Sequence, residues 1–183
     1  MTGRTGPAGT RSASAGSARR ESASTGSATT GSASPGQVAA ALQSALAAEN
    51  AAVYGYGVAG GQLGSTARSL ALRNWTQHEM ARDRLQAMLT SLGVKPVAAQ
   101  AAYQMPFPVH GTRAAISLAG YLENQVAAAY LGVVALDDPR LRAWGARQAQ
   151  ACALRATTWL GRTAAFPGLT SGSTAPARPT ASP

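Results

Sequence analysis

A single carboxylate in the middle of an apolar helical run is the feature of this sequence that most constrains its fold. The run extends from Leu46 to Val58, and Glu49 is its one acid. Large residues recur with Glu49 at three- and four-residue spacing, as on the core-facing side of an amphipathic helix. A buried carboxylate costs several kcal/mol unless it is paired. Another part of the chain must therefore bring a proton donor, a cation or a metal to Glu49.

Three further runs show the same helical periodicity, so the sequence predicts four helices. Capping residues mark where each helix begins, and glycine or an acid marks where it ends. We expect the first helix to begin at Gln37. The second should be capped by Ser65 or Thr66 and end at Leu92, and the third should be capped by Thr112. The fourth should begin at Asp138-Pro139 and end near Gly161.

The segment between the second and third helices is about twenty residues long and contains Pro96, Pro106 and Pro108. It shows no strand pattern, and a connection of that length is unusual inside a compact domain. Extended chain covers up to ~3.3 Å per residue, enough to run the whole length of a helix bundle. We therefore expect an all-α four-helix bundle in which a long crossover joins two parallel helices.

Composition sets the expected domain limits. Residues 1–35 are rich in Ser, Ala, Thr and Gly, and residues 170–183 are similar. Such segments cannot bury enough apolar surface to offset the entropy of ordering. We expect a disordered leader over 1–35, the bundle over 36–169 and a disordered tail over 170–183. A start codon assigned too far upstream would also explain the leader.

The net charge of +9 comes from basic residues that are scattered singly along the chain. Nucleic-acid binding proteins cluster such residues and interleave aromatic ones, so no specific nucleic-acid partner is expected. Cys152 is alone, so no internal disulfide forms. No secretory signal or membrane span is visible, which favours a soluble cytoplasmic protein. The excess of Arg over Lys and the abundant Ala are typical of a GC-rich, actinobacterial genome.

Polar residues occur near the middle of each apolar stripe, and mid-helix positions of a bundle meet at one level. The sequence Glu-Asn-x5-Tyr also occurs twice, which suggests a pseudo-twofold arrangement. Two acids and two arginines would balance, with the other side chains completing the hydrogen bonds. The expected central polar network is Glu49, Tyr56, His78, Arg82, Glu123, Tyr130, Gln148 and Arg155.

A metal site is the alternative interpretation. Di-iron and di-manganese bundles use one Glu from each of two helices and Glu-x-x-His from each of the other two. Here the second helix has Glu79-x-x-Arg82 and the fourth has Cys152-x-x-Arg155, and arginine is not a metal ligand. We therefore expect no metal cofactor. The alternative is an iron or manganese oxidoreductase with a reduced ligand set of Glu49, His78, Glu79 and Glu123.

A third interpretation is a binding module. Glycines recur in the second half of the first helix, from Gly55 to Gly64. They would allow the close approach of another helix, or leave a groove for a small apolar ligand or a partner helix.

The ordered set of motifs resembles a ferritin-like domain family of unknown function found in actinobacteria, over about residues 37–160. The residues that carry the resemblance are Ala48-Glu49, Tyr54-Gly-Tyr-Gly57, His78-x-x-x-Arg82-Asp83, Ala102-Tyr103, Pro106, Pro108-Val109, Leu122-Glu123 and Tyr130. It implies a ferritin-like bundle with a long crossover. The wider superfamily suggests di-iron oxidation or storage, but the matched residues do not reproduce the iron ligands. The expectation is a ferritin-like protein without an assigned biochemical role, with a homodimer as the candidate assembly.

Overall fold

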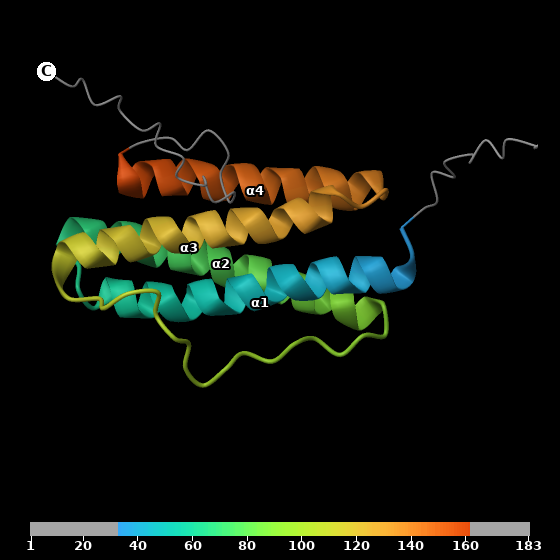
Figure 1. Cartoon of the computed structure of the whole chain (residues 1–183), viewed down its shortest axis with the longest axis horizontal. Coiled ribbons are helices and arrows are strands. Elements are labelled where there is room, and N and C mark those ends of the chain that lie inside the picture. Colours follow the sequence, from blue (N-terminus) through green and yellow to red (C-terminus); the bar gives the residue numbers. More distant parts are fainter. Residues whose placement is uncertain (1–32, 162–183) are drawn as a thin grey trace, which may run out of the picture. The chain divides into compact units, whose positions relative to one another are not determined.

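The computed structural model describes residues 33–161, which form four helices and no strand. The all-α prediction is therefore confirmed for this range (Figure 1). None of these helices is long and apolar enough to cross a membrane. Nearly all of the predicted leader and the whole predicted tail lie outside the described residues. The helices are α1 (Pro35–Gly60), α2 (Ser65–Ser91), α3 (Gly111–Val134) and α4 (Pro139–Leu160).

Two of the helix starts are capped by side chains. Ser34 Oγ accepts a hydrogen bond from the Gln37 backbone, and the Gln37 side chain accepts one from the Ser34 backbone, which completes a capping box. Asp138 caps α4 in the predicted way, with Pro139 in the first turn. These caps satisfy backbone donors that have no partner within the helix.

The predicted caps of α2 and α3 are wrong. Gly64 precedes α2, so the predicted cap at Ser65 or Thr66 is displaced, and His110 precedes α3. Thr112 instead donates its hydroxyl to the Gln62 carbonyl at 3.2 Å. The Gly111 amide donates to Gln62 Oε1 at 3.0 Å. The start of α3 is thus tied to the turn that follows α1 by contacts that local sequence cannot reveal.

The chain between α2 and α3 returns along α1. Near the start of α1, the Gln43 side chain donates to the Lys95 carbonyl at 2.7 Å and accepts from the Val97 amide at 2.8 Å. Further along α1, the rings of Tyr54 and Tyr103 lie 5.5 Å apart. Later residues of this segment thus contact later residues of α1. Figure 1 shows α2 and α3 running in the same direction.

The core lies between α1 and its neighbours α2 and α3, and between α3 and α4. It consists of two apolar clusters, and the polar residues of the central level lie close to where one cluster gives way to the other. Large members of one cluster are Leu42, Leu46, Leu85, Leu89, Val126, Val133 and Trp144. The other includes Ala59, Leu63, Ala71, Leu118, Leu122 and Trp159.

Two glycines of α1 give a matched test of close helix approach. A Cβ at position 55 would lie 2.6 Å from Leu122 Cδ1, whereas a Cβ at position 57 would meet nothing within 4 Å. Gly57→Ala should therefore stabilise the protein by about 0.5–1 kcal/mol, the usual gain of alanine over glycine in a helix. Gly55→Ala should be at least about 1 kcal/mol less stable than Gly57→Ala, because Leu122 must move within a packed core. Urea denaturation measures both, and equal stability of the two variants would contradict the close approach.

Candidate functional site

His78 lies between two buried glutamates at the centre of the bundle. Its Nδ1 is 2.6 Å from Glu49 Oε2, and its Nε2 is 3.3 Å from Glu123 Oε1. All three side chains are at most 1% exposed. Because they come from α1, α2 and α3, this one imidazole links three helices.

In the repeated Glu-Asn-x5-Tyr elements, the tyrosine of each element hydrogen-bonds the glutamate of the other. Tyr56 donates its hydroxyl to Glu123 Oε1 at 2.6 Å, and Tyr130 donates to Glu49 Oε1 at 2.7 Å. Seven residues of helix span about 10 Å, so neither phenol reaches the acid of its own element. Each instead reaches the acid of the facing helix. The two reciprocal bonds are consistent with approximate twofold symmetry between α1 and α3.

Arg155 brings α4 into the same centre. Its Nε donates to Glu123 Oε1 at 2.8 Å, and a terminal nitrogen contacts the buried Cys152 sulfur at 3.2 Å. Glu123 Oε1 therefore has three polar contacts, from Tyr56, His78 and Arg155. The other oxygen, Glu123 Oε2, is buried and has no hydrogen-bond partner among the described residues.

Two further members of the centre were missed by sequence reasoning. Asn74 donates a side-chain hydrogen bond to the Tyr56 hydroxyl at 3.3 Å, and Trp159 Nε1 donates to it at 2.9 Å. Asn74 lies four residues before His78, and Trp159 lies four residues after Arg155. That spacing places each on the same helix face as a predicted member, which is the signal that could have found them.

Arg82 and Gln148 do not join the centre, although the sequence suggested that they would. Arg82 is partly exposed and pairs with Asp83 at 2.8 Å and with Glu79 at 3.6 Å. The expected pairing of Arg82 with a buried acid is therefore wrong, because His78 occupies the space between the acids. Gln148 is half-buried, and within residues 33–161 it makes no hydrogen bond to the centre.

Glu79, which the alternative metal set included, is also outside the centre. Its side chain is 28% exposed and faces Arg82. The reason is its position next to His78, about 100° further around the helix.

The surroundings of the centre set its charges. Burial alone lowers the pKa of His78, but its contacts with Glu123 and Glu49 outweigh burial and raise that pKa to about 9. Burial would raise the pKa of Glu123, but His78 and Arg155 together lower it. At neutral pH the centre therefore contains an imidazolium and a guanidinium facing two carboxylates.

The neighbouring phenols and thiol remain protonated. Burial and the nearby Glu123 raise the pKa of Tyr56, and burial and Glu49 raise that of Tyr130. Both phenols are thus hydrogen-bond donors to the carboxylates at any physiological pH. Burial raises the pKa of the Cys152 thiol, which removes the thiolate needed for nucleophilic or metal-binding chemistry.

These residues do not fit a di-iron or di-manganese site. Both ring nitrogens of His78 already contact the two acids, so neither is free to bind a metal in this arrangement. Arg155 adds a fixed positive charge beside Glu123, where a divalent cation would be repelled. Within the described residues, no group of three or more His, Cys, Asp or Glu side chains has an arrangement that could hold a metal ion.

Comparisons with known proteins place the chain among its relatives. A solved structure of a conserved hypothetical protein from Mycobacterium tuberculosis is 32% identical, with a TM-score of 0.67. The match covers 69% of this chain and 97% of that one. No curated protein matches. The family model described as a domain of unknown function, DUF4439, matches residues 41–171, and the chain belongs to that family.

Proposed function

We propose that this protein is a ferritin-like four-helix bundle in which a neutral network of Glu, His, Arg and Tyr takes the place of a metal site. The network joins the helices at their middle, and the protein acts as a non-enzymatic module. The sequence motifs and the course of the chain between α2 and α3 support the fold assignment. An actinobacterial origin and a homodimeric assembly stay predictions.

One observation carries this proposal: His78 contacts both buried acids, and Arg155 contacts the second of them. Two negative charges face two positive charges, so the centre needs no added cation for neutrality. Removing one partner of a buried ion pair strongly destabilises the fold, because the other charge stays buried without a counter-charge. The function that this arrangement supports is therefore to fix the relative positions of the helices.

A metal-dependent oxidoreductase is the second candidate, and the unpartnered Glu123 Oε2 is the observation that favours it. A buried carboxylate oxygen without a donor is a potential ligand for iron or manganese. Glu49 and His78 are the neighbouring side chains that could complete a small ligand set, but His78 would first have to lose a proton and turn away from the acids. Arg155 would also have to withdraw from Glu123.

Metal analysis of the purified full-length protein separates the two candidates. Cells are grown with added iron and manganese, and metals are measured by mass spectrometry after gel filtration without chelator. We expect only traces of iron, manganese and zinc. A full equivalent of any of them, lost in Glu123→Gln, would overturn the structural assignment and support the oxidoreductase.

A further inference from the structure

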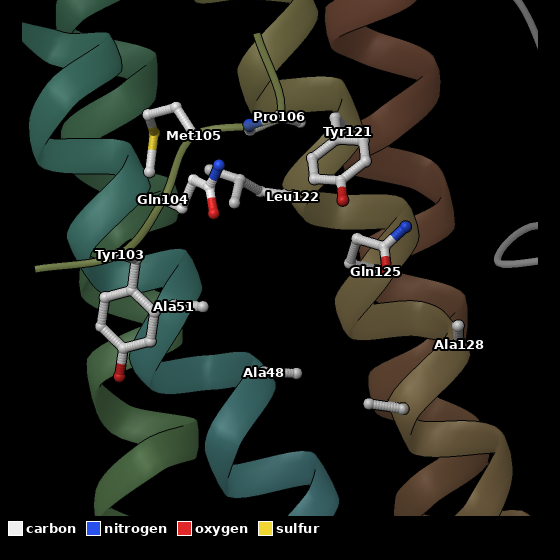
Figure 2. Close-up of a pocket in the computed structure, with 11 residues that line it drawn as sticks. Ala48, Ala51, Tyr103, Gln104, Met105, Pro106, Tyr121, Leu122, Gln125 and Ala128 are labelled. Carbon is white, nitrogen blue, oxygen red and sulfur yellow. The ribbon is translucent and has the colours of Figure 1, made fainter. Parts of the chain in front are cut away.

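The segment between α2 and α3 is held by α1 at one end and by the residues that follow α1 at the other, and it covers a cavity at its middle. Gln43 fixes one end through the backbone of Lys95 and Val97, and Gln62 fixes the other through Gly111. Between these points, residues 103–106 pass over a cavity of about 620 Å³ between α1 and α3 (Figure 2). Contacts within the chain therefore hold this segment on both sides of the cavity.

The cavity is lined by small side chains and by two tyrosines. Its floor is made of small side chains from two helices, and Figure 2 shows those of α1 directed towards α3. Tyr103 and Tyr121 lie on opposite sides of the opening, and Met105 and Pro106 lie at one end of the lining (Figure 2). The floor residues are Ala48, Ala51, Ala128 and Ala129. Such a floor leaves room for a flat body, and methionine adapts its shape to what it contacts.

The lining is uncharged although the protein is strongly basic. None of the lining residues is Asp, Glu, Lys, Arg or His, whereas the whole chain carries a net charge of +9. A charged ligand would lose water there without meeting an opposite charge, which is costly. The polar groups that remain include the amides of Gln104 and Gln125, which make no hydrogen bond to other described residues. They can donate to and accept from a neutral ligand.

We propose that this cavity binds an uncharged small molecule with a flat apolar body and one hydrogen-bonding end. The body lies on the alanine floor between Tyr103 and Tyr121, and the polar end meets Gln104 and Gln125. The volume falls within the range of roughly 300–1,000 Å³ that small-molecule sites have. This site is separate from the buried Glu and His centre, and its existence does not depend on the function of that centre.

Two fluorescent probes of opposite character test the proposal on the full-length protein. The neutral probe is 1-aminoanthracene, and the anionic probe is 8-anilinonaphthalene-1-sulfonate. We expect the neutral probe to bind saturably at one site and the anionic probe to bind at least about tenfold more weakly, because it finds no counter-charge. Equal binding of the two probes, or no binding of the neutral probe, would overturn the proposal.

Variants locate the site. Ala51→Phe fills the floor and should abolish binding of the neutral probe, whereas Ala146→Phe, at an exposed position of α4 outside the cavity, should not change it. Gln125 is exposed, so Gln125→Lys should fold and should shift the preference towards the anionic probe. Circular dichroism checks the fold of each variant. If Ala51→Phe is unfolded, the result for Gln125→Lys decides, and an unchanged preference there would contradict the site.

Discussion

Replacing Glu123 with alanine should lower the free energy of unfolding by about 3–5 kcal/mol, the cost of breaking a buried ion pair. The change leaves the Arg155 guanidinium and the Tyr56 hydroxyl without their acceptor, and His78 without one of its two. Glu79→Ala is the matched control. Its partly exposed carboxylate is 3.6 Å from Arg82, so removing it should cost no more than about 1 kcal/mol.

Glu49→Ala should have an intermediate effect. It removes the acceptor of Tyr130 and one acceptor of His78 but leaves the Arg155–Glu123 pair intact. Urea denaturation followed by circular dichroism ranks the three variants. If Glu123→Ala were as stable as Glu79→Ala, the centre would be solvated and would not hold the helices together.

The second large effect is on the pH dependence of stability. The pKa of His78 is about 9 in the folded protein, compared with an ordinary value of 6.5. The folded state binds this proton more tightly than the unfolded state does. The protonated His78 therefore stabilises the fold fully below pH 6.5, and this stabilisation is lost as the pH rises through 9. One pH unit of pKa difference is worth about 1.4 kcal/mol, so the loss is on the order of 3 kcal/mol.

His78→Gln is the control for this titration, because glutamine keeps a hydrogen-bonding side chain but does not titrate. The variant should be less stable at neutral pH and should show little change across the same range. The measurement is the urea midpoint at several pH values for both proteins. A wild-type midpoint that does not change between pH 6.5 and 9 would contradict a charged His78 in the folded state.

The sequence predicted the four helices because their apolar periodicity and most of their ends depend on local residues. The long segment between α2 and α3 was also recognisable, since its prolines and length exclude a helix. The starts of α2 and α3 were misplaced by one or two residues. At α3 the reason is a contact with Gln62, a residue distant in sequence.

The residues of the centre were predicted only in part, because their partners are also distant in sequence. Helical spacing showed that Glu49, His78 and Glu123 face the core, but it could not show which cation each acid meets. Arg82 lies four residues after His78 on a similar face, and its long side chain reaches Asp83 at the surface instead. The cavity beneath residues 103–106 was not predicted, because it depends on how a segment without regular periodicity is held.

The protonation state of the His78 ring decides between an ion-pair network and a metal site. A histidine that bridges two carboxylates as an imidazolium has protons on both ring nitrogens, whereas a metal ligand needs one nitrogen without a proton. The chain has two histidines, so a His110→Gln variant assigns the ring signals in a nitrogen-15 NMR spectrum. We expect both His78 nitrogens to be protonated at pH 7 and the ring to titrate near pH 9. An unprotonated ring nitrogen at pH 7 would contradict the ion-pair network.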